Sequence, residues 1–320
     1  MKLPPFMPFL KLKKPLNGLK ELRDFDPGLS DLAALLIGAK PVLYTDFSAD
    51  SWPYIRGLCE ALKLKYLMPE AIYGKEGFKA VPETGKRMLL IGKSAKALKE
   101  AAKNWLRSPT DPAWGLLLGY PGCCVKAYIE WRSVAARTDL VNFTCGRTRE
   151  KERFHFGLNN VFNYFSRLTG QPADMEAFAR LRAANKDLDI SALQVISWHP
   201  CAYDCGPSVK LAGEIFAFLS AYLPERAGEL KERLGKPVLF RDKYEYIVLA
   251  GLAKKGEARY TGISKPRGLL PGTIKDKIAA GNVLRVGKGR VSVFRDSEPL
   301  YKIASARPFS LLNFTASKRG

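Results

Sequence analysis

Four of the six cysteines of this chain stand in two short segments that lie far apart in the sequence. One segment, at 119–125, reads G-Y-P-G-C-C-V, and the other, at 198–208, reads W-H-P-C-A-Y-D-C-G-P-S. Each has a turn marked by proline and glycine that runs into a helical pattern. The amide groups and dipole at the start of a helix favour a thiolate, the form of cysteine that binds metals and attacks electrophiles. If the cysteines act together, the fold must bring two distant helix starts to one place.

Thiolates grouped in this way suit a metal centre. Cys145, in the loop-like segment F-T-C-G-R, would complete a set of four thiolates, and His199 is a substitute ligand. Because adjacent cysteines seldom both bind one compact centre, we expect one of Cys123 and Cys124 to be spare or reactive. The predicted metal ligands are Cys123, Cys124, Cys145, Cys201, Cys205 and His199.

Soft thiolate ligands favour either an iron–sulfur cluster or zinc. The C-x2-C pairs of zinc ribbons are absent from the sequence. The candidate ligands are also scattered through a large core, whereas structural zinc usually holds a small local unit together. We therefore expect an iron–sulfur cluster, with zinc as the alternative.

Two further functions remain open on the sequence. Cys201 lies near His199 and Asp204, which could make it an activated nucleophile in a thiol-dependent enzyme. Alternatively, the cysteines are structural and the protein binds or processes nucleic acid. No paired carboxylates, serine triad or dinucleotide fingerprint stands out, so the sequence leaves open whether the chain is an enzyme.

The two cysteine segments also resemble a known family. G-L-L-L-G-Y-P-G-C-C-V at 115–125 and H-P-C-A-Y-D-C-G-P-S at 199–208 are similar to paired motifs of a prokaryotic family, common in archaea, that has no settled activity. The resemblance covers residues 85–225. This chain lacks one residue that the family has between the histidine and the first cysteine. The resemblance implies a shared cysteine site and implies nothing about substrate.

Positive charge is concentrated at the two ends of the chain. The net formal charge is +21. Residues 1–110 carry 19 Lys and Arg against 11 Asp and Glu, 111–235 carry 15 against 14, and 236–320 carry 18 against 6. Basic flanks around a neutral centre favour a polyanion such as RNA as partner. No apolar run is long enough for a membrane span, and we interpret the N-terminus as the start of a cytoplasmic protein.

The pattern of elements predicts an α/β fold with a partly parallel sheet and flanking helices. Strands at 41–47 and 87–91 alternate with helices at 54–64 and 94–106, an order typical of such sheets. We predict an N-terminal α/β module at 1–110, a mainly helical, cysteine-bearing central module at 111–235, and a small, basic, β-rich C-terminal domain at 236–320. Within the central module, the patterns predict helices at 158–168 and 207–223 and a strand at 193–198. Beyond them, G-K-G-R at 287–290 predicts a hairpin.

Overall fold

A computed structural model describes residues 29–47, 51–69, 87–107, 112–150, 152–164, 167–287 and 289–315. The chain divides into two compact units. Unit 1 comprises Met1–Ile129 and Lys210–Gly228, and unit 2 comprises Glu130–Val209 and Glu229–Gly320. The division falls inside three helices, α6 (Gly122–Arg132), α9 (Gly206–Tyr222) and α10 (Pro224–Leu234), each of which is continuous across it. The three-part division expected from charge and texture stays a prediction.

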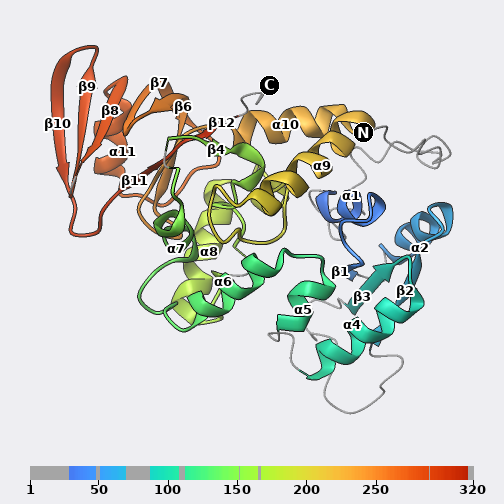
Figure 1. Ribbon diagram of the computed structural model, residues 1–320. Coiled ribbons are helices and arrows are strands. Elements are labelled where there is room, and N and C mark those ends of the chain that lie inside the picture. The colour runs from blue at the N-terminus through green and yellow to red at the C-terminus, as the bar shows by residue number, and fades with distance from the viewer. Residues whose placement is uncertain are drawn as a thin grey trace. The chain divides into compact units, whose positions relative to one another are not determined.

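Unit 1 contains a small sheet with helices around it (Figure 1). Its elements are α1 (Ser30–Leu36), β1 (Val42–Phe47), α2 (Trp52–Ala61), β2 (Lys65–Leu67), β3 (Arg87–Gly92), α4 (Ala95–Arg107), α5 (Pro112–Leu117) and the parts of α6, α9 and α10 (Pro224–Leu234) that belong to it. The strand order is β1-β3-β2. β3 pairs antiparallel with both neighbours, so the expected parallel pairing is wrong here. β1 and β2 do run the same way on either side of α2, but β3 enters between them in the opposite direction.

The core of unit 1 follows the predicted helical spacing of α4. Leu98, Ala101 and Ala102 are buried, and they pack with Leu90 of β3 and Trp114 of α5. Cys59, on the apolar face of α2, is also buried, and burial raises the pKa of its thiol to about 12.

Unit 2 contains the large sheet. Its elements are α7 (Leu140–Arg147), β4 (Phe154–His155), the 3-10 helix η3 (Phe156–Leu158), α8 (Pro172–Ala184), η5 (Ile190–Ala192), most of α10, β5 (Val238–Phe240), β6 (Tyr246–Lys254), β7 (Glu257–Ser264), α11 (Gly272–Ala279), β8 (Val283–Gly287), β9 (Arg290–Arg295), β10 (Glu298–Ala304), β11 (Ser310–Leu312) and β12 (Phe314–Thr315). Seven of the strands form one sheet in the order β10-β9-β8-β7-β6-β5-β11. Neighbouring strands of this sheet pair antiparallel, and β8 and β9 form the predicted hairpin. The one parallel pair among the described strands joins β4 and β12.

Two elements predicted in the central module are not formed. Residues 159–164 form turns rather than a helix, and 193–198 are irregular rather than a strand. The side chains of Asn160 and Asn163 explain both results, because they are buried and donate to the carbonyls of Trp198 and Ser197. Side chains of the first segment therefore satisfy backbone carbonyls of the second, a tertiary arrangement that overrides the local helical pattern.

The described helices are short. The longest of them, α9, has 17 residues. None of the helices in the described ranges combines the length and apolar character that crossing a membrane requires.

Candidate metal centre

Cys123 and Cys124 lie in the first turn of α6 (Figure 1), as the sequence predicted. The amide groups of Cys124 and Val125 donate to the carbonyl oxygen of Pro121 at 2.8 and 3.0 Å, which closes this first turn. Cys123 is exposed and Cys124 is buried. Their Sγ atoms are 3.9 Å apart. Two neighbouring residues therefore present their sulfurs side by side at a helix start.

Gly119 sets the turn that leads into this helix. Its φ is +78°, in the left-handed region that glycine adopts readily. A Cβ at this position would come within 2.5 Å of the carbonyl oxygen of Ala39 and 2.9 Å of Cα of Lys40. The turn therefore packs directly on the backbone that precedes β1. Lys40 is itself buried there in an ion pair with Asp31 at 2.7 Å, and its Nζ lies 5.1 Å from the centroid of the Tyr120 ring.

Cys201 and Cys205 flank the turn that precedes α9. The amide of Cys205 donates to the carbonyl of Ala202 at 3.1 Å, and the carbonyl of Cys205 accepts from the amide of Val209 at 2.9 Å. Cys205 is thus the residue from which the helix starts, with Pro207 in the first turn as predicted. Cys205 is buried, whereas Cys201 is half-buried.

Side chains from the end of α7 hold this turn in place within unit 2. Thr144 Oγ1 donates to the carbonyl of Pro200 at 3.1 Å. Thr148 Oγ1 donates to the carbonyl of Thr144 at 2.8 Å and accepts from the amide of Tyr203 at 2.9 Å. Asp204 Oδ2 accepts from two further backbone amides, those of residues 149 and 150, at 3.1 and 3.2 Å. Both threonines and the backbone of this turn are therefore tied together by buried or half-buried hydrogen bonds.

The ring of Tyr203 adds a packing contact to these hydrogen bonds. It is 1% exposed, stacks on Phe154 with ring centroids 4.8 Å apart, and meets Phe314 edge-on at 5.2 Å. The residue between the two cysteines is thus anchored in the core beside β4 and β12.

Four of the predicted ligands are grouped in the structure. The Sγ atoms of Cys123, Cys124, Cys201 and Cys205 all lie within 4.8 Å of one another, and such a group could hold a metal ion. Cys145 and His199 are not members of this group. Both adjacent cysteines belong to it, and the expectation that one of them is spare stays a prediction.

The two other candidates have different surroundings. Cys145 lies in α7 rather than in a loop and is half-buried. His199 is 5% exposed, and neither of its ring nitrogens has a hydrogen-bond partner among the described residues. Burial, reinforced by the positive charge of Arg167, lowers the pKa of His199 well below its usual value. His199 is therefore neutral at physiological pH.

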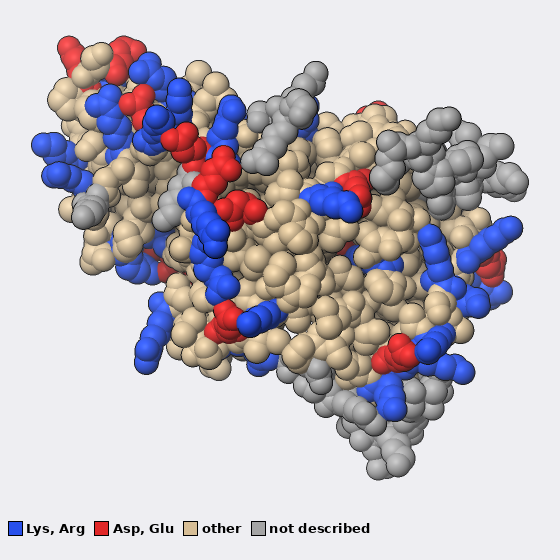
Figure 2. Space-filling model, viewed as in Figure 1, with Lys and Arg blue, Asp and Glu red and all other residues tan. Residues whose placement is uncertain are grey.

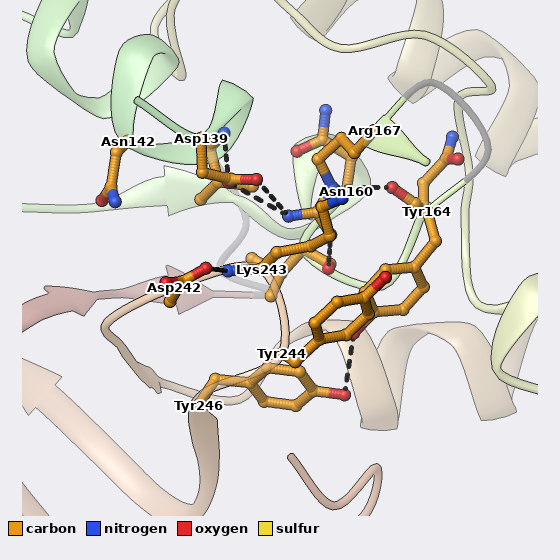
Figure 3. Close-up of polar contacts among 12 residues, drawn as sticks. Asp139, Asn142, Asn160, Tyr164, Arg167, Asp242, Lys243, Tyr244 and Tyr246 are labelled. Carbon is orange, nitrogen blue, oxygen red and sulfur yellow. Dashed lines mark hydrogen bonds and ion pairs between the residues drawn. The ribbon is translucent and has the colours of Figure 1, made fainter. Parts of the chain in front are cut away.

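Arg167 is the centre of a buried polar network that no sequence pattern indicated (Figure 3). This guanidinium is fully buried and binds both carboxylate oxygens of Asp139, at 3.1 and 3.3 Å. It also donates to the carbonyls of Asn163 and Val161 and lies 4.8 Å from the ring centroid of Tyr164. Asp139 in turn caps α7, accepting from the amide of Val141 at 2.9 Å. Arg167 thus joins the helix that holds the Cys201–Cys205 turn to the irregular segment after η3.

Asp174, in the first turn of α8, makes the stability of unit 2 depend on pH. Its carboxylate accepts hydrogen bonds from Lys243 Nζ, Tyr244 Oη and the amide of Thr169, each at 2.7 Å. Burial alone would raise the pKa of Asp174, but these hydrogen bonds outweigh it and lower the pKa to about 2. A depressed folded-state pKa stabilises the fold above the unfolded value of 3.8, and this contribution is lost as the pH falls toward 2.

We therefore expect Asp174→Asn to lower the free energy of unfolding by about 1–2 kcal/mol near neutral pH, and by progressively less as the pH falls from about 4 to 2. Urea denaturation of the full chain at several pH values would measure this difference. Asp187→Asn is the control, because the carboxylate of Asp187 pairs with Lys265 at an exposed site and should contribute less. A difference between wild type and Asp174→Asn that does not change with pH would contradict the assignment.

Comparison with known proteins gives no relative from which to transfer a function. No protein-family model, curated protein or solved structure matches the chain.

Proposed function

We propose that the protein binds a metal through Cys123, Cys124, Cys201 and Cys205, and that the bound species is a single tetrahedral ion, zinc before others. The observation that carries the proposal is the grouping of four sulfurs within 4.8 Å. Four thiolates around one zinc, with Zn–S bonds of about 2.3 Å, have sulfurs about 3.8 Å apart. The separation of 3.9 Å between Cys123 and Cys124 is close to that value.

The spacing of the four sulfurs favours a single ion over the iron–sulfur cluster expected from the sequence. The thiolates of a four-iron cluster each bind a different iron, which holds their sulfurs further apart than ligands that share one ion. Four thiolates also fill all the positions of a tetrahedral ion, an arrangement typical of a structural site. We therefore propose that the ion stabilises the fold around the two helix starts. The cluster is the alternative identity of the centre.

Metal analysis of the full chain, purified without oxygen and combined with a visible spectrum, tests the proposal. We expect about one equivalent of zinc per chain and no visible absorption, because zinc has a filled d shell. If iron and sulfide are found together with a broad visible band, the centre is an iron–sulfur cluster rather than a single ion. If neither metal is present near one equivalent per chain and all four thiols are rapidly alkylated, the proposed metal centre is overturned. That result would favour a thiol-dependent enzyme.

Removal of the Thr148 hydroxyl should weaken metal binding although this residue is no ligand. Thr148→Val keeps the shape of the side chain but removes the hydrogen bonds to Tyr203 and Thr144 that hold the turn between Cys201 and Cys205. Groups that orient metal ligands typically contribute about 10–100-fold in affinity. We expect a loss in that range, measured by competition with a chromophoric chelator.

The matched control is Thr45→Val, since Thr45 is also buried but lies in β1 of unit 1, outside the turn between Cys201 and Cys205. It should leave the metal affinity unchanged. Equal affinities for Thr148→Val and the wild type would show that the hydroxyl does not position the ligands.

A further inference from the structure

From the end of β6 to β10, the seven-stranded sheet of unit 2 has one face in the core and one face outside it, whereas both faces are buried at β5 and the start of β6. Ala258, Leu284, Val293 and Ile303 are buried in a cluster on the inner face, where Ile278 of α11 packs with them. Side chains alternate between the two faces of a strand. The residues next to these four in β7, β8, β9 and β10 therefore lie on the opposite, outer face.

Strand register aligns the outer side chains in two rows that cross five strands, from β6 to β10 (Figure 1). The first, here called the basic row, consists of Lys254, Glu257, Arg285, Ser292 and Lys302. The second, the apolar row, consists of Leu252, Arg259, Val283, Phe294 and Pro299, of which Val283 is buried. Four inter-strand spacings of about 4.8 Å make each row about 19 Å long.

Cations predominate on this face. Lys254, Arg259, Arg285 and Lys302 are all exposed, and one carboxylate, that of Glu257, stands among them. Arg285 and Arg259 share this carboxylate at 2.8 and 3.1 Å, so its single charge cannot balance both. Figure 2 shows Lys and Arg side chains, with Asp and Glu side chains among them, over the end of the molecule where β8, β9 and β10 lie. A surplus of positive charge on an open face attracts a polyanion.

Apolar groups beside the cations narrow the choice of polyanion. Leu252 is 76% exposed, and the half-buried ring of Phe294 lies beneath the guanidinium of Arg285, with 4.8 Å between its centroid and Cζ. Unpaired bases can stack on an aromatic ring or a guanidinium plane, whereas the bases of a duplex are stacked on one another. Phosphates along one row and bases over the other match a single strand.

We propose that the outer face of β6–β10 binds single-stranded RNA, with phosphates on the basic row and bases on the apolar row. Glu257 and Ser292 supply hydrogen-bond acceptors within the basic row. A carboxylate repels phosphate, but it accepts a hydrogen bond from a ribose 2′-hydroxyl, a group that DNA lacks. This inference concerns a surface other than the cysteine group and does not rest on the proposed metal centre.

The test uses the full-length triple variant Lys254→Glu/Arg285→Glu/Lys302→Glu and a fluorescently labelled, mixed-sequence single-stranded RNA. All three side chains are exposed, so the fold should persist, which circular dichroism and an unchanged metal content would verify. Anisotropy titrations across a salt series should show affinity lowered by about tenfold or more at moderate salt. The slope of log Kd against log salt should fall by about 2, since single strands contribute about 0.7 per phosphate contact. Phe294→Leu should weaken binding by roughly fivefold or more through lost stacking.

Lys96→Glu/Lys99→Glu/Lys103→Glu is the matched control. It makes the same change of charge on exposed positions of α4 in unit 1, and it should keep most of the affinity. Equal losses in the two triple variants would overturn the proposal, because net charge rather than the sheet face would then determine binding. Tighter binding of a duplex, or equal binding of single-stranded DNA of the same sequence, would overturn the choice of single-stranded RNA. Glu257→Gln should reduce the preference for RNA over DNA.

Discussion

Cys123→Ser and Cys201→Ser are each expected to retain less than about a tenth of an equivalent of metal after dialysis against a chelator, compared with about one equivalent in the wild type. A serine hydroxyl does not ionise near neutral pH and is a hard, weak ligand for the metals that four thiolates select. Cys123 is exposed and Cys201 half-buried, so neither substitution should itself disturb packing. Because the free energy of metal binding adds to that of folding, the melting temperatures of both variants should also be lower than that of the wild type. A chelator should lower the melting temperature of the wild type and leave those of the two variants unchanged.

Cys145→Ser is the matched control for these variants. Its thiol is half-buried like that of Cys201, but its sulfur is outside the group of four. We expect it to bind metal as the wild type does. Loss of metal from Cys145→Ser together with full retention in Cys123→Ser would return Cys145 to the ligand set and make Cys123 the spare thiol.

The candidate ligands were predictable because cysteine carries chemistry in its own side chain. A cysteine at the start of an amphipathic pattern, after a turn of proline and glycine, can be recognised without knowing the fold. The choice among six candidates could not be made in this way. Cys145, in a loop-like segment, and Cys201, in a turn before a helix, are both candidates on the sequence, and only the three-dimensional positions of their sulfurs separate them.

The fold was predictable where local pattern and tertiary packing agree. The buried face of α4, the start of α9 and the hairpin of β8 and β9 all follow from spacing and turn residues. The direction of β3 could not be predicted, because the order of strands and helices does not determine which strand enters between two others. The helix predicted at 158–168 is absent for a related reason. The side chains of Asn160 and Asn163 bind partners that lie more than 30 residues away in the sequence.

Arg167 has the largest expected effect on stability. Arg167→Met should lower the free energy of unfolding by about 3–5 kcal/mol, because it leaves the carboxylate of Asp139 buried without its partner. The side chains of this pair are 0% and 8% exposed. Arg147→Met is the control, since Arg147 pairs with Glu130 at 2.6 Å but both side chains are at least 40% exposed. An exposed pair of this kind contributes less than about 1 kcal/mol. Chemical denaturation of the full chain would measure both, and equal losses would contradict the role given to Arg167.

A second substitution separates the cost of the unpaired charge from the cost of lost contacts. Asp139→Asn removes the charge but keeps an oxygen that can accept from the amide of Val141, and asparagine is as good a helix cap as aspartate. In the background of Arg167→Met, Asp139→Asn should therefore restore stability by about 1 kcal/mol or more, because no lone buried charge remains. If the double variant were instead less stable than Arg167→Met, the main contribution of Arg167 would be its hydrogen bonds to the carbonyls of Val161 and Asn163. Arg167 would then act by satisfying the irregular backbone after η3, and the ion pair with α7 would be secondary.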